Sequence, residues 1–170
     1  MITALGIDPG LRATGYSVIQ GDRHGCRIRE LGVIQSTSPD LFQRLRLTYQ
    51  NIAAILHEHR PELVVLEDLF AHPTFPRTAL DLAHLRGVIS LAAALADIPV
   101  ETLTSAAVKR ALTGSGRAGK AQVQAMVALL LGLPARPDQH AADAAALALT
   151  ALSRRGVTLR VIPAPVEARA

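Results

Sequence analysis

The stretch ITALGIDPG, residues 2–10, combines a run of apolar residues with a carboxylate at its end. The apolar residues predict a strand over 2–8 that is buried on both faces of a sheet. Asp8 is the last residue of this strand and precedes a turn at Pro9-Gly10. Since an Asp before Pro-Gly is common turn chemistry, the stretch itself leaves two roles open for Asp8, a turn cap or part of a functional site.

The rest of the chain predicts a mixed series of strands and helices. Two strands, 15–20 and 26–35, flank a turn at 21–25 and suggest an antiparallel meander. Helical spacing follows over 39–60, and ELVVLE (62–67) is a second buried strand that ends on a carboxylate. The remaining expected elements are a loop (68–77), a helix (78–97), a strand (99–103) and helices over 105–112, 120–131 and 140–154. This order predicts one α/β domain over 1–155, with helices on the faces of a mixed sheet, and a flexible tail over 156–170.

Composition limits the classes of function. The 170 residues are 49% hydrophobic, which argues against disorder, and the net charge of +4 with a pI near 10.0 favours a polyanionic partner. The lone Cys26 excludes an internal disulfide. No signal peptide is visible and apolar runs such as MVALLLGL are too short to span a bilayer, so we expect a cytoplasmic protein without a membrane partner.

Four polar side chains form the candidate catalytic set. Asp8 and Glu67 end two buried strands, and if those strands are parallel neighbours both carboxylates emerge at one edge of the sheet. His140 and Asp143 are three residues apart and share one helix face. Converging carboxylates repel one another unless a cation lies among them, and oxygen ligands suit Mg²⁺ or Mn²⁺. The alternatives are that Asp138 or Asp143 serves the helix start and that His140 is solvated.

Three motifs resemble the RuvC family of Holliday-junction resolvases: GIDPGLRATGYSVI, VVLEDLF and HAADAAALALT, in the family's order. The resemblance implies an RNase H-like fold with a mixed five-stranded sheet. It also implies a homodimeric, metal-dependent endonuclease of DNA recombination and repair. Such an enzyme makes paired symmetric nicks in four-way junctions, leaves 5′-phosphate and 3′-hydroxyl ends, and works with a branch-migration complex.

By position, the resemblance makes Asp8, Glu67, His140 and Asp143 the ligands of two Mg²⁺ or Mn²⁺ ions per site. Two such ions form the clamp used for phosphoryl chemistry. Many family members carry Asp where this chain has His140. An imidazole removes one negative charge and favours Mn²⁺ relative to Mg²⁺.

The segment GSGRAGKA (114–121) matches most of a nucleotide-binding P-loop, but Ala121 replaces the Ser or Thr that would bind Mg²⁺, and the segment follows a helix instead of a strand. We interpret it as a glycine-rich loop that opens a helix and contacts phosphate. The resemblance places Lys109 and Lys120 near the scissile phosphate, Lys120 as a catalytic residue, and adds Arg117 to the DNA-binding set. The alternative is a mobile loop with solvated lysines.

The loop over 68–77 carries two of the three phenylalanines. A loop Phe usually packs into the core, but Phe70 matches a family aromatic that stacks on an unpaired base at the junction. Beyond Phe70 the loop is longer by one residue than in some relatives, which makes the carry-over of Phe75 and Arg77 to the DNA-binding set less direct.

A stripe of small residues runs along the helix expected over 78–97, at Ala83, Gly87, Ser90 and Ala94. Gly inside a helix costs about 1 kcal/mol relative to Ala, so its presence suggests a close neighbour. That neighbour is either a second copy of the chain, in a dimer, or the sheet of the same chain.

Two other functional classes compete with a nuclease. An actin-like ATPase or sugar kinase also begins with a strand and a D-x-G turn, but needs two domains and a second phosphate motif. A nuclease-inactive junction-binding module would keep the basic surface and lose the carboxylates. The carboxylates present here favour the enzyme.

Overall fold

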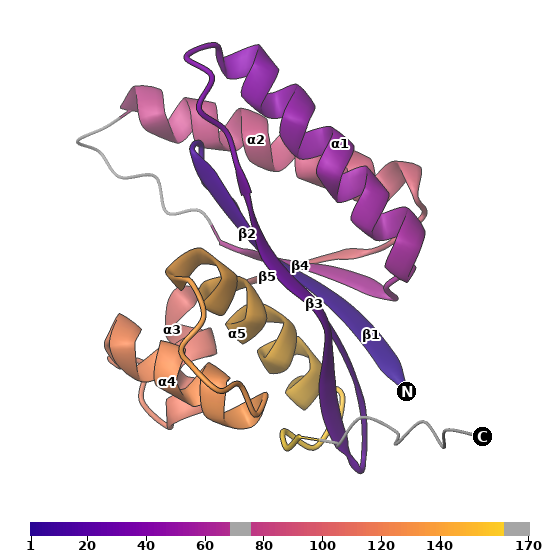
Figure 1. The fold of residues 1–170 in the computed structure, drawn as a ribbon, viewed down its shortest axis with the longest axis vertical. Helices are drawn as coiled ribbons and strands as arrows, with labels where there is room; N and C mark the ends of the chain where they lie inside the picture. Colours follow the sequence, from indigo (N-terminus) through magenta and orange to yellow (C-terminus); the bar gives the residue numbers. More distant parts are fainter. Residues whose placement is uncertain (69–75, 162–170) are drawn as a thin grey trace.

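The computed structural model describes residues 1–68 and 76–161, and its centre is a five-stranded sheet (Figure 1). The strands are β1 (Ile2–Asp8), β2 (Ala13–Asp22), β3 (Gly25–Gln35), β4 (Leu63–Glu67) and β5 (Val100–Leu103), in the order β3-β2-β1-β4-β5. The first three strands are antiparallel, whereas β4 and β5 run parallel to β1. The expected meander and mixed sheet are therefore confirmed.

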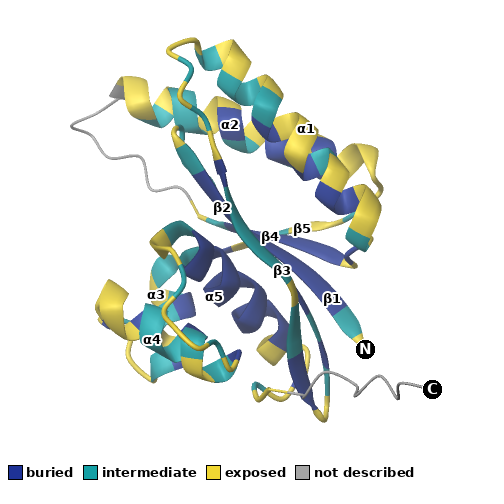
Figure 2. Cartoon of the chain, viewed as in Figure 1, coloured by how far each residue is buried: buried dark blue, intermediate teal, exposed yellow. Residues whose placement is uncertain are grey.

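In the described part of the chain, five helices cover the two faces of the sheet. One face carries α1 (Leu41–His59) and α2 (Pro76–Leu95), and the other carries α3 (Ser105–Thr113), α4 (Lys120–Leu130) and α5 (Gln139–Arg154) (Figure 1). Each face has its own apolar core. Figure 2 shows α5 as the most completely buried helix, in keeping with its alanine-rich sequence, which allows close packing.

The parallel pairing of β1 with β4 brings the two strand-ending carboxylates to one edge. Ile7 is paired with Leu66 in this register, so Asp8 and Glu67 are the next residues along their strands. This edge is the carboxyl end of both strands, where open α/β sheets place their sites.

Two glycines let α5 lie directly on the sheet beside that edge. A Cβ at Gly6 would lie 2.0 Å from the carbonyl oxygen of Ala144, and one at Gly15 would lie 2.0 Å from the carbonyl oxygen of His140. Gly15 is also the cross-strand partner of Asp8. The absence of a Cβ at these two glycines therefore sets the distance between α5 and the sheet beside Asp8.

Several expected boundaries are corrected by the structure. The second strand is longer than 15–20, because its ends also pair with neighbours. The helix expected over 78–97 begins at Pro76, where a missing N–H costs nothing. It ends at Leu95, and Asp97 then adopts a left-handed φ of 56°.

Residues 157–161, expected to belong to a flexible tail, are attached to the β2–β3 hairpin. Val157 is buried, and the N–H of Thr158 donates to the Asp22 carbonyl over 3.1 Å. The N–H of Cys26 donates to the Arg160 carbonyl over 2.7 Å, and Val161 forms a parallel bridge with Cys26. These contacts correct the expectation for 157–161, while residues 162–170 lie outside the described part.

Within the described residues, one helix segment, Arg77–Leu95 of α2, is long and apolar enough to cross a membrane by length and composition alone. On its inner side, the buried Leu85, Ile89 and Ala93 belong to the apolar core that α2 shares with α1 and the sheet. Its outer side leaves Leu91 and Leu95 exposed. The apolar character of α2 thus comes from two faces, of which α1 and the sheet cover one.

Candidate catalytic cavity at the carboxyl edge of the sheet

A cavity of about 310 Å³ opens at the carboxyl ends of β1 and β4. Six residues singled out in the sequence line it, and they come from two strands and three helices: Asp8, Glu67, Lys109, Lys120, His140 and Asp143. The fold therefore brings together a carboxylate set and two lysines that are spread over most of the chain.

The start of α5 fixes His140 against Asp8. The Asp138 carboxylate caps the helix by accepting the His140 N–H over 2.8 Å, which confirms a helix-start role for Asp138. The His140 ring then lies with Nδ1 2.8 Å from Oδ2 of Asp8. The Asp8 carboxylate thus faces across to α5, whereas the N–H of Gly10 in the turn donates to Thr14 Oγ1 over 3.4 Å.

The charges in the cavity act on one another. Burial raises the pKa of Asp8, against the opposing hydrogen bond from His140, and the negative charge of Glu67 raises the pKa further. The pKa of Asp143 is also raised, by burial and then by the charge of Asp8. Lys120 opposes both shifts. The cavity holds more negative charge than its own residues compensate, which favours a bound cation.

The donor set fits hard divalent ions. Aspartate and glutamate oxygens with one imidazole suit Mg²⁺ or Mn²⁺. The four side chains line the cavity wall without forming a tight cage. Among the described residues, the one group of three ligand atoms that all lie within 4.8 Å of one another is found elsewhere, and it includes none of these four residues. Mg²⁺ usually keeps several waters and takes phosphate oxygens as further ligands, and the cavity volume, about ten times the roughly 30 Å³ share of a liquid water, leaves room for them.

Arg86 supports this site from outside the cavity, and the sequence did not predict it. Its guanidinium reaches from α2 to the backbone carbonyl of Glu67 and donates to Thr102 Oγ1 over 2.9 Å. Arg86 therefore ties the end of β4 to β5 and holds the backbone that carries Glu67. The sequence does show a basic residue within the apolar pattern of a helix, but that pattern does not predict which backbone group the side chain will contact.

The basic residues divide into two groups. Lys109, half-buried on α3, and Lys120, exposed at the first turn of α4, line the cavity. Arg117 and Arg77 are exposed and do not line it. The expected loop at 114–119 and the helix start at Lys120 are confirmed. Phe70 and Phe75 lie outside the described residues.

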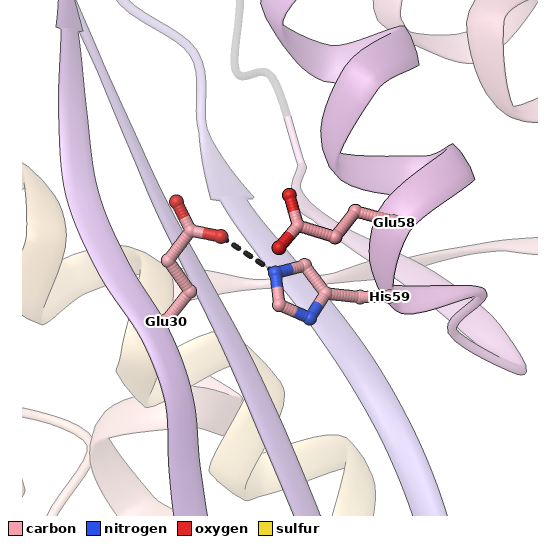
Figure 3. Close-up of side chains that lie close together, drawn as sticks. All are labelled: Glu30, Glu58 and His59. Carbon is pink, nitrogen blue, oxygen red and sulfur yellow. Dashed lines mark hydrogen bonds and ion pairs between the residues drawn. The ribbon is translucent and has the colours of Figure 1, made fainter.

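A second polar cluster, not anticipated from the sequence, lies between β3 and the end of α1 (Figure 3). His59 Nε2 is 2.6 Å from one Glu30 oxygen, and the Tyr16 hydroxyl donates to the other over 2.7 Å. Glu30, Glu58 and His59 each offer a ligand atom within 4.8 Å of the others. The cluster shares no residue with the catalytic cavity, and its hydrogen bonds attach α1 to the sheet.

Comparison with known proteins supplies the family. The family model of the crossover junction endodeoxyribonuclease RuvC matches residues 4–151. The chain is 45% identical to the crossover junction endodeoxyribonuclease RuvC of Rhodopirellula baltica over 147 residues, which cover 85% of this chain and 83% of the relative.

Solved structures give the same answer in three dimensions. The Thermus thermophilus RuvC structure matches with a TM-score of 0.81 and 32% identity over 91% of this chain and 97% of that one. The same enzyme in complex with a Holliday junction substrate matches with a TM-score of 0.81 and 29% identity, covering 93% and 99%. The fold is therefore the RNase H-like fold of RuvC, and the chain belongs to the RuvC family of crossover junction endodeoxyribonucleases.

Proposed function

We propose that this protein resolves four-way DNA junctions by paired symmetric nicks, as metal-assisted hydrolysis that leaves 5′-phosphate and 3′-hydroxyl ends. The observation that carries the proposal is the single cavity in which Asp8, Glu67, Asp143 and His140 meet two lysines. The matching family and the related structure with a junction substrate support the same substrate class.

In this proposal Asp8, Glu67, His140 and Asp143 hold two Mg²⁺ or Mn²⁺ ions. Such a pair supplies an activated water and neutralises the charge on the leaving oxygen. The protein's own part is to hold the ligands on rigid elements and to place the Lys120 and Lys109 ammonium groups beside the phosphate. There they stabilise the negative charge that develops in the transition state. Ser105 lines the cavity from the start of α3, but no hydrogen bond among the described residues joins its hydroxyl to a base, and Cys26 is buried elsewhere.

We further propose a homodimer with its contact on the outer side of α2. Ala83, Gly87 and Ala94 are exposed, and a Cβ at Gly87 would have nothing within 4 Å. The alternative that the chain's own sheet is the close neighbour of Gly87 is therefore wrong. Leu91 and Leu95 on this helix are 54% and 66% exposed. A junction has two equivalent strands to cut, and a two-fold dimer presents two copies of one site to them.

By family, we propose that the protein works in the cytoplasm, together with a complex that moves the branch point. A pull-down of branch-migration proteins with the purified chain tests the second proposal.

The experiment that tests the function is cleavage of a synthetic four-way junction by wild type and Glu67→Gln with Mg²⁺ or Mn²⁺. The variant should lose cleavage and keep junction binding, because phosphate contacts come from basic residues. Glu101→Gln is the matched control: its charge change lies on β5, where Glu101 pairs with Arg155 over 2.8 Å, outside the cavity. Normal cleavage by Glu67→Gln would remove Glu67 from the active site.

A further inference from the structure

A polar groove follows the loop between β3 and α1. It consists of two adjoining hollows of about 450 and 400 Å³, both lined by residues 35–38. Arg12 and Arg44 also line the first hollow, and Arg46 lines the second. We call this surface, made by Arg12, Ser36, Thr37, Ser38, Arg44 and Arg46, the arginine groove.

The charge of the arginine groove is of one sign. Among the described residues, no acidic side chain lines either hollow. The nearest carboxylate along the chain, Asp40, caps α1 by accepting the Phe42 N–H over 2.8 Å. Arg44 shapes the groove wall, because its guanidinium donates to the carbonyls of Ser38 (2.6 Å) and Pro39 (3.2 Å).

The other two arginines are available to a ligand. Arg12 and Arg46 are exposed, and neither belongs to an ion pair among the described residues. Phe42 precedes Arg46 by one helical turn and so shares its side of α1. Phe42 is 76% exposed. Cationic side chains next to an exposed aromatic ring are the combination that contacts nucleic-acid backbones and bases.

The arginine groove lies close to the catalytic cavity, at the other end of the β1–β2 turn. Pro9 lines the cavity, and Arg12, three residues further on, lines the groove. The Arg12 carbonyl accepts the Ser36 N–H over 2.9 Å, which joins the β1–β2 turn to the groove loop. Three residues span at most about 10 Å, or roughly three base-pair steps of 3.4 Å.

We propose that the arginine groove binds the phosphodiester backbone of the junction arm that leaves the catalytic cavity. Arg12 and Arg46 contact its phosphates, the hydroxyls of residues 36–38 assist them, and Phe42 packs against a sugar or base of the same arm. This inference rests on the proposed junction-cleaving function and adds a DNA contact outside the cavity and outside the basic residues named from the sequence.

The test is the salt dependence of junction binding, measured by fluorescence anisotropy with a labelled four-way junction, without divalent ions, from 50 to 200 mM salt. Each phosphate contact contributes about 0.9 to the slope of log affinity against log salt. Arg12→Gln/Arg46→Gln should therefore flatten the slope by about 1.8. Over this range the affinity of wild type should fall roughly 12-fold more than that of the variant.

The control Arg23→Gln/Arg29→Gln removes the same charge from exposed positions outside the groove, one in the β2–β3 turn and one on β3. This control should keep the wild-type slope. Phe42→Ala should weaken binding at every salt concentration without changing the slope, because it removes no charge. If the Arg12 substitution prevents folding, Arg46→Gln by itself still predicts a slope change of about 0.9.

A double variant with the slope of the control overturns the groove assignment. If Phe42→Ala binds like wild type, Phe42 is not part of the surface. The results distinguish the groove assignment from the proposed function. A wild-type protein that neither binds nor cuts junctions would contradict the proposed function. A wild-type protein that cuts junctions, together with an Arg12→Gln/Arg46→Gln variant of unchanged slope, would contradict only the groove assignment.

Discussion

Substituting Gly15 by Ala should displace the catalytic end of α5 without touching any catalytic side chain. The added Cβ would lie 2.0 Å from the His140 carbonyl oxygen and 2.8 Å from the Ala141 nitrogen. An ordinary contact begins at 3.4 Å. The first turn of α5 must therefore move by up to 1.4 Å, because the atoms in the way are backbone atoms.

The consequences for stability and activity differ in size. Overpacking of this kind costs about 1–3 kcal/mol, which for a chain of this length lowers Tm by roughly 2–12 °C. The same movement takes His140 Nδ1 away from its 2.8 Å contact with Asp8. A misplacement near 1 Å in a catalytic arrangement can cost about 10²-fold in rate, so we expect a loss of that order in single-turnover junction cleavage.

A matched variant in the same strand separates the two effects. A Cβ at Gly21 would lie 2.5 Å from Val157 Cγ1, at the opposite end of β2 from Asp8. Gly21→Ala should thus lower Tm, measured by circular dichroism, with cleavage near the wild-type rate. If folded Gly15→Ala also cuts at the wild-type rate, the contact between α5 and Gly15 does not position the site.

Three further predictions follow from the same structure. His140→Asp should shift relative activity toward Mg²⁺, because a carboxylate replaces an imidazole that favours Mn²⁺; equal metal ratios in titrations of both proteins would place His140 outside the ligand set. Gly87→Leu should stay folded, since that position is open, and should weaken the dimer in sedimentation. The control Ala54→Leu, on the exposed side of α1, should leave the dimer intact. A fully dimeric Gly87→Leu protein would exclude the outer side of α2 from the dimer interface. Burial and the hydrogen bond to Glu30 raise the pKa of Tyr16 to about 12, so the folded state holds the phenolic proton more tightly than the unfolded state. The free energy of unfolding should therefore be unchanged below pH 10 and should fall between about pH 10 and 12. The loss should not exceed about 1 kcal/mol, because the ring is partly exposed. Denaturant unfolding against pH checks this, and a Tyr16→Phe protein with the same alkaline loss would contradict it.

Much of the site was visible in the sequence because its signals are local. An apolar strand that ends on Asp8, a second that ends on Glu67, and the spacing of His140 and Asp143 on one helix each follow from residues close together along the chain. The period of side-chain direction in a strand or helix is a property of the local backbone. Element types, the mixed sheet and the identity of the candidate ligands therefore followed from the sequence.

The tertiary structure decided the relations between elements that are distant in sequence. The order β3-β2-β1-β4-β5 makes Asp8 and Glu67 neighbours, and the glycines at 6 and 15 set the distance from the sheet to α5. Which side of α2 faces outward, and which backbone carbonyl Arg86 binds, also depend on packing partners. The period of a helix or strand determines the direction in which each of its side chains points. The group that a side chain contacts there belongs to another element of the chain, so the contact is determined only by how the two elements pack in the folded protein.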